Sequence, residues 1–155
     1  VEQQIPVGQQ SGPPVAIAPT PTIAPPLPTA IPPSQYEFLL AEQAQFEEQI
    51  TPRIFLYVYQ TLEGLDGYTV RVRKDGHDLP VTQKTVAGMP GITWPIPTDR
   101  QRHTNLKLEF PNVSPAGLWE VQLIDSTGRD VGPIATFRLQ PNERNQEMYV
   151  KYRKR

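Results

Sequence analysis

Few residues of this chain have the types and spacing that acid–base or metal chemistry requires. Its two histidines, His77 and His103, lie far apart in the sequence, and neither has a second His or a Cys at the spacing of a metal-binding pair. Both fall in predicted turns or loops. We therefore expect the two imidazoles to be solvated loop side chains rather than metal ligands.

Two carboxylates, Glu109 and Glu120, come closest to a catalytic pair. A glycosidase needs two such groups facing each other across a cleft, and these two lie on the outward faces of predicted strands that could be neighbours. A solvated sheet face explains both more simply. The chain also has no Gly-x-Ser-x-Gly sequence, no phosphate-binding glycine loop and no cysteine. The sequence predicts a protein that is not an enzyme and that uses no cofactor or metal.

The charge balance argues against partners that are held by bulk electrostatics. The 155 residues carry 15 Lys and Arg against 16 Asp and Glu, a formal net charge of -1. Nucleic acids and anionic membranes recruit proteins through an excess of basic side chains. No run of about 18 apolar residues occurs, so we also expect no membrane insertion. Proteins, and secondarily glycans, remain as the expected partners.

Proline divides the chain into two parts. Ten of the 19 prolines fall within residues 1–34, where Glu2 is the only charged residue. Proline fixes φ and removes an amide donor, so this Pro/Thr-rich arm is predicted to be polyproline II or irregular, with no core of its own. We expect it to become ordered by lying on a partner, through Pro19, Pro21, Pro25, Pro26 and Pro28.

Residues 35–52 are predicted to form a helix on or beside the folded part. Ser34 and Glu37 have the spacing of a capping box, and good helix formers follow as far as Glu48. Pro52 would end the helix, because proline removes a backbone donor and clashes with the preceding turn.

From Arg53 onward the pattern changes to short runs of β-branched and aromatic residues separated by turn residues. Residues 68–73 alternate between apolar and polar side chains, and the Asp75-Gly76 pair that follows is a hairpin signal. Near-regular spacing of such runs is typical of an antiparallel sandwich or barrel. The runs cover 54–62, 68–73, 105–110, 119–123, 134–139 and 148–152. We therefore predict an all-β domain over 53–155 that ends in a basic tail at 153–155.

One segment is similar to a known family. Residues 115–128 read Pro-Ala-Gly-Leu-Trp-Glu-Val-Gln-Leu-Ile-Asp-Ser-Thr-Gly. They resemble the penultimate hairpin of immunoglobulin-like domains, the fibronectin III-like kind included, in bacterial secreted and surface proteins. The resemblance implies an immunoglobulin-like antiparallel β-sandwich of about seven strands, with a role in adhesion, substrate binding or assembly. The helix and the run at 148–152 depart from a minimal unit of that family.

A strand over residues 54–59 is apolar on both faces. Something must therefore cover the outer side chains Phe55, Tyr57 and Tyr59. The helix at 35–49 is the simpler cover; the alternative is a neighbouring subunit or its arm, because proline segments dock on aromatic grooves. Trp94, beside two prolines in a loop, either stacks on a ligand or closes the end of the sandwich.

These features predict a non-catalytic structural subunit of an extracellular or cell-surface assembly, which is a filament, a sheath or a surface complex. Its arm docks on neighbouring subunits, which are copies of itself or other subunits of the assembly. The alternative is a carbohydrate-binding or spacer module of a secreted enzyme or adhesin, with Trp94 and nearby tyrosines as its sugar-binding surface. The first residue is Val1 rather than Met, which we interpret as a mature chain after signal-peptide removal or as a trimmed one.

Overall fold

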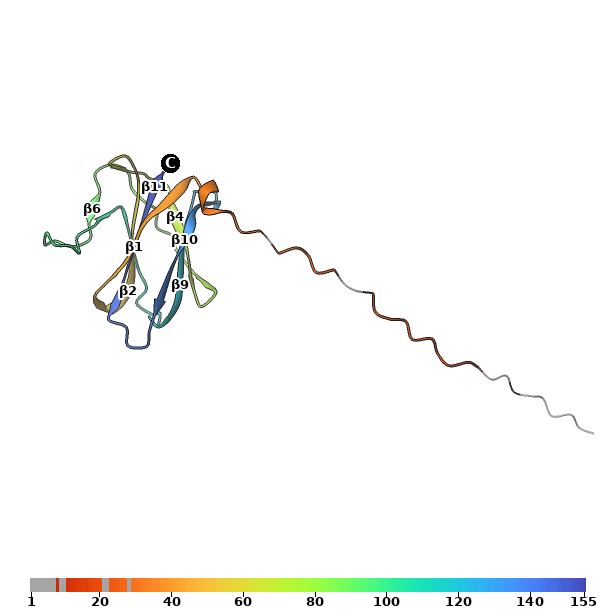
Figure 1. Ribbon diagram of the computed structural model, residues 1–155. Coiled ribbons are helices and arrows are strands. Elements are labelled where there is room, and N and C mark those ends of the chain that lie inside the picture. The colour runs from red at the N-terminus through yellow and green to blue at the C-terminus, as the bar shows by residue number, and fades with distance from the viewer. Residues whose placement is uncertain (1–7, 9–10, 21–22, 28) are drawn as a thin grey trace, which may run out of the picture. The chain divides into compact units, whose positions relative to one another are not determined.

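The computed structural model describes residues 8, 11–20, 23–27 and 29–155, and the regular secondary structure of its folded unit, Ile31–Arg155, consists almost entirely of strands (Figure 1). This confirms the all-β class. The unit begins with a short 3-10 helix, η1 (Pro33–Gln35). The strands that follow are β1 (Phe38–Phe46), β2 (Glu48–Gln60), β3 (Glu63–Gly64), β4 (Thr69–Lys74), β5 (His77–Leu79), β6 (Gly91–Ile92), β7 (His103–Thr104), β8 (Leu106–Glu109), β9 (Gly117–Ile124), β10 (Asp130–Leu139) and β11 (Asn145–Lys154).

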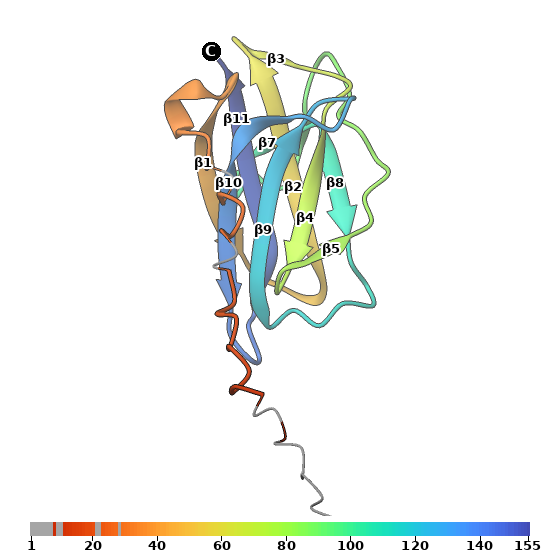
Figure 2. The same ribbon diagram turned by 90° about the vertical axis from the view of Figure 1, so that its right-hand side faces the viewer.

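Two main sheets form the folded unit. The five-stranded sheet has the order β1-β11-β2-β3, with β8 also paired to β2, and the four-stranded sheet has the order β10-β9-β4-β5. Figure 2 shows the four-stranded sheet in front of the five-stranded one. A small hairpin of β6 and β7 comes from the long connection between β5 and β8. The main sheets thus form two layers.

A hydrophobic core lies between the layers. Alternate residues of β2 and β9 point into it, because successive side chains of a strand point to opposite faces. Those without exposed surface are Ile54, Leu56, Val58, Trp119, Val121 and Leu123. The Trp119 indole nitrogen donates a hydrogen bond to the Pro115 carbonyl oxygen at 2.8 Å, which satisfies the polar group. All buried members of this core lie between Phe38 and Tyr152, so residues 31–155 contain the contacts they need to fold without the arm.

The prediction of a helix at 35–52 is wrong. Apart from η1, the segment forms β1 and the start of β2. β1 pairs with β11 in antiparallel register, from Phe38 opposite Lys154 to Phe46 opposite Glu147. The intrinsic helix preferences of ordinary residues differ by at most about 0.7 kcal/mol per residue. Pairing with β11 instead satisfies the backbone hydrogen-bonding groups along one whole side of β1. Tertiary pairing therefore overrides local preference.

An irregularity in β1 explains why its sequence fits both patterns. The register shifts between Leu40 and Glu42, and such a bulge moves the following side chains to the opposite face. Before the shift, Phe38 and Leu40 pack on the core; after it, Ala44 and Phe46 pack on the outer face of the sheet. The apolar residues therefore recur at uneven intervals, as they do on a helix.

β11 lies at the centre of the five-stranded sheet. It pairs antiparallel with β1 and parallel with β2, two strands that only Glu47 separates in the sequence. The expected basic tail is largely part of this strand. Lys154 Nζ forms an ion pair with Glu37 at 3.1 Å, and Arg155 Nε donates a hydrogen bond to the Tyr36 carbonyl oxygen at 2.9 Å. The end of the sequence is therefore held against its start in the folded unit.

The other predicted strands are present, most with wider bounds. The segment at 115–128 contains β9 and the turn that leads antiparallel into β10. In that turn, the Asp125 carboxylate accepts hydrogen bonds from the Thr127 hydroxyl at 2.6 Å and the Arg129 amide at 3.1 Å. These bonds hold the pKa of Asp125 well below its usual range. The turn is therefore closed by its own side chains.

The Pro-rich arm is described in part. At residues 8, 11–20, 23–27 and 29–30 it has neither helix nor strand, and every one of these residues is exposed. Pro19, Pro25 and Pro26 are among them, whereas Pro21 and Pro28 lie outside the described residues. Its larger apolar side chains expose between 89% and 93% of their surface, namely Val15, Ile17, Ile23 and Leu27.

Candidate functional site

The outer face of the five-stranded sheet carries a second apolar cluster. Phe55, Tyr57 and Tyr149 are buried there, and Ala44, Phe46 and Tyr59 pack beside them. The prediction that β2 is apolar on both faces is therefore correct: its even-numbered residues from 54 to 58 enter the core, and its odd-numbered neighbours form this cluster.

The β6–β7 hairpin covers one part of the cluster, where a helix had been expected. Arg102 Nε forms an ion pair with Glu42 Oε1 of β1 at 2.6 Å, and the same guanidinium lies 5.3 Å from the centre of the Phe46 ring. The Tyr149 hydroxyl donates a hydrogen bond to the His103 carbonyl oxygen at 2.8 Å. Burial raises the pKa of Tyr149, so its hydroxyl remains a donor.

A buried ion network anchors the same loop. Glu147 of β11 has no exposed surface, and its Oε2 accepts hydrogen bonds from Arg53 Nη2 at 2.6 Å, Arg53 Nε at 2.9 Å and Arg100 Nη2 at 3.0 Å. These charge-assisted bonds offset part of the cost of burying the carboxylate, whose Oε1 has no hydrogen-bond partner among the described residues. The Arg100 guanidinium also lies 3.9 Å from the centre of the Trp94 ring. That face of Trp94 is therefore occupied by the protein itself.

The rest of the cluster opens into a hollow of about 460 Å³, which we call the aromatic groove. Its floor includes the stacked rings of Tyr57 and Tyr59, whose centres are 4.7 Å apart with an interplanar angle of 2°. Its rim is unusually apolar for a surface, since Leu62 exposes 81% and Met89 94% of their area. The lining residues are Tyr57, Tyr59, Thr61, Leu62, Met89, Pro90, His103 and Lys151.

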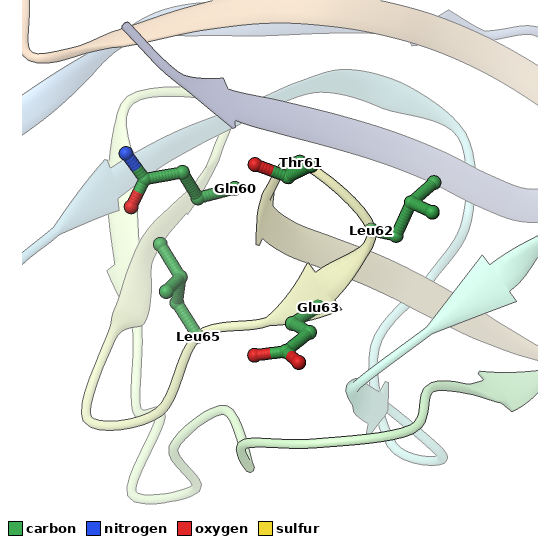
Figure 3. Close-up of a pocket in the computed structure, with 5 residues that line it drawn as sticks. All are labelled: Gln60, Thr61, Leu62, Glu63 and Leu65. Atoms are coloured by element: carbon green, nitrogen blue, oxygen red, sulfur yellow. The ribbon is translucent and has the colours of Figure 1, made fainter.

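Two neighbouring hollows extend the aromatic groove. One, of about 440 Å³, is formed by the turn between β2 and β3 (Figure 3) and shares Thr61 and Leu62 with the groove. The other, of about 110 Å³, lies beside the β6–β7 hairpin and shares His103 and Lys151 with it. The shared residues place both hollows directly beside the aromatic groove.

The polar groups in the aromatic groove are mainly hydrogen-bond donors. Lys151 Nζ lies 5.1 Å from the centre of the Tyr59 ring and 6.0 Å from that of Tyr57. Burial and the neighbouring Tyr59 raise the pKa of Tyr57, so its phenol stays protonated near neutral pH. No carboxylate lines the groove itself. The Tyr57 hydroxyl already donates to the Leu62 carbonyl oxygen at 3.3 Å. The site therefore offers the Lys151 cation, the Tyr59 and Thr61 hydroxyl groups and aromatic faces to acceptor-rich, uncharged or acidic partners.

Sequence reasoning missed Asn105, which positions one wall of the groove. The side chain is buried; its Oδ1 accepts a hydrogen bond from the Val58 amide at 3.0 Å, and its Nδ2 donates to the carbonyl oxygens of Val58, Leu65 and Val86 at 2.9 to 3.1 Å. These bonds tie β2 to the segment that leads to Met89. A single Asn at the first position of a predicted strand carries no local signal of this role.

The residues considered for catalysis are not brought together. His77 lies in β5 and His103 in β7, which belong to different sheets. Glu109 lies in β8, where it forms an ion pair with Lys107 at 2.6 Å, and Glu120 lies in β9 of the opposite layer. The expectation that these two carboxylates could sit on neighbouring strands is therefore wrong.

Phe55, Tyr57 and Tyr59 are the predicted interaction residues that the fold gathers on one surface. Within the described residues, no helix is long and apolar enough to cross a membrane, and no group of three or more His, Cys, Asp or Glu side chains is placed to hold a metal ion. Comparison of the chain with family models, curated proteins and solved structures gives no match. Function must therefore be argued from the groove.

Proposed function

We propose that this protein is a non-catalytic interaction subunit of an extracellular or cell-surface assembly, in which the aromatic groove of one copy receives the Pro-rich arm of a neighbouring copy. The observation that carries the proposal is the pair of stacked tyrosines, Tyr57 and Tyr59, in a groove whose apolar rim is left open to solvent. Aromatic-lined grooves are the usual docking surfaces for polyproline segments, which lose little conformational entropy on binding.

Exposed apolar side chains on both the groove and the arm support docking of the arm in the groove. Leu62 and Met89 project from the rim of the groove, and Ile17 and Ile23 project from the arm, all with more than four-fifths of their area exposed. Contact between the two surfaces removes this area from water, which stabilises the complex by roughly 25 cal/mol per Å². Each surface therefore covers exposed apolar area of the other.

The polar groups are complementary as well. A polyproline segment has unpaired carbonyl oxygens and few amide donors, whereas the groove supplies the Lys151 ammonium and the Tyr59 hydroxyl group. From residue 3 to residue 34 the arm has no charged side chain. It can therefore lie along the groove without burying an unpaired charge.

The finer fold assignment belongs to the same proposal. Two sheets around one core, with a β9–β10 hairpin that resembles the penultimate hairpin of immunoglobulin-like domains, support an immunoglobulin-like sandwich. The position of β11 between β1 and β2 is a departure from that family. The resemblance to secreted and surface modules, together with the Pro/Thr-rich arm, supports a location outside the cell.

Removal of the arm tests the proposal. Size-exclusion chromatography with light scattering should find concentration-dependent oligomers for the full chain and monomers for residues 31–155, and a peptide of residues 11–33 should bind the latter. An arm-deleted chain that assembles like the full one would contradict the proposal. A monomeric full chain that binds the peptide only after its arm is removed would contradict it too, since the arm would then occupy the groove of its own chain.

A further inference from the structure

The arm contains the same tripeptide twice. Ile17-Ala18-Pro19 and Ile23-Ala24-Pro25 begin six residues apart, and both isoleucines are more than nine-tenths exposed. Polyproline II has three residues per turn and a rise of 3.1 Å per residue. In that conformation six residues make two full turns, which would bring Ile17 and Ile23 to the same side of the segment, about 19 Å apart.

We infer that the two Ile-Ala-Pro tripeptides are equivalent docking registers for the aromatic groove of a second copy, which deepens the proposed function and rests on it. A branched aliphatic side chain fits between Leu62 and Met89, and the proline two residues later packs flat on the Tyr59 ring. The carbonyl groups between them, which polyproline II leaves unpaired, accept a hydrogen bond from Lys151.

Only one register is used at a time. A folded unit of this size has a radius of gyration of about 14 Å, so two units centred about 19 Å apart on the same side of the arm would overlap. Each arm therefore binds one groove but offers it two positions. Two equal positions double the apparent affinity over one, and the loss of either leaves the other intact.

The test uses peptides of residues 11–33 and the chain 31–155, which contains the whole described core. Fluorescence anisotropy should find that Ile17→Ser and Ile23→Ser each weaken binding about twofold, and that the double variant weakens it more than about tenfold, because neither tripeptide then offers an isoleucine side chain to the groove. A peptide of the same composition with both tripeptides scrambled should bind as weakly as the double variant.

The possible outcomes distinguish failure of the two-register inference from failure of the proposed function. If one single variant binds as weakly as the double variant, a single register is used and the inference is wrong, although the proposed function stands. A scrambled peptide that binds like the native one would mean that composition alone is recognised, with the same consequence. Absence of binding by the native peptide would overturn both the inference and the proposed function.

Discussion

The outer faces of the two sheets differ sharply. On the four-stranded sheet most outward residues are polar, with Ile134 as an apolar exception, and several pair with one another, as in Arg71–Asp130 at 2.6 Å and Arg73–Asp78 at 2.8 Å. On the five-stranded sheet the outward residues of β2 are Phe55, Tyr57 and Tyr59. The first face is built to meet water. The second has the composition of a core with an incomplete cover.

This difference shows how the second face is stabilised. The β6–β7 hairpin covers one part of it through Arg100 and Arg102, which hold Glu147 and Glu42. The remaining part, around Tyr59, keeps an open apolar rim. Large exposed apolar patches are uncommon on monomeric proteins and mark interaction sites.

The largest effect should come from the buried carboxylate of the covered face. Glu147→Gln removes the charge that faces Arg53 and Arg100. Arg53 keeps its ion pair with Glu48 at 2.8 Å, but Arg100 loses its carboxylate partner in a poorly hydrated place. We expect the free energy of unfolding to fall by about 3 kcal/mol, measured by urea denaturation. The matched change on the other face, Asp78→Asn, removes an exposed pair and should cost at most about 0.5 kcal/mol. Equal losses would remove the contrast between the faces.

A smaller change in free energy is expected for binding at the aromatic groove, the uncovered part of the outer face. Tyr59→Ala removes one ring of the stacked pair and should weaken binding of the 11–33 peptide at least about tenfold, or about 1.4 kcal/mol. Tyr59→Phe keeps the ring and should retain most of the affinity. Arg73→Ala on the opposite face should leave binding unchanged. If Arg73→Ala weakened binding as much as Tyr59→Ala, the peptide would lie on the wrong face.

The smallest effect concerns salt. The peptide 11–33 has no charged side chain, so screening has no ion pair to weaken. Affinity measured by anisotropy should change less than about twofold between about 0.05 and about 0.5 M NaCl. A loss of about tenfold over that range would instead indicate that charge holds the occupant, which favours an acidic partner on Lys151 over the arm.

Local pattern was sufficient for several elements. Alternation at 68–73 identified β4, and the turn residues Asp75-Gly76 identified its hairpin with β5. Apolar residues on both faces of β2 correctly indicated that its outer side needs a cover. These features depend on neighbours within a few residues, since the period of two and the turn conformations are properties of short segments.

Local pattern failed where distant segments decide. At Phe38–Phe46 the helix-forming residues gave the wrong element, because strand β11, about a hundred residues later in the chain, pairs with this edge. The same holds for the cover of the outer face, which depends on ion pairs from Arg100 and Arg102 to residues far away in the sequence.

The amino-acid sequence by itself determined the all-β class, the uncharged Pro-rich arm and the amphipathic period of most strands, because these follow from backbone preferences and from which side chains avoid water. Tertiary structure alone decided that β11 lies between β1 and β2, that Glu147 is buried against two arginines, and that Tyr57 and Tyr59 line an open groove. These outcomes required contacts between residues far apart in the chain, whose pairing depends on the free energy of the whole fold rather than on any one segment.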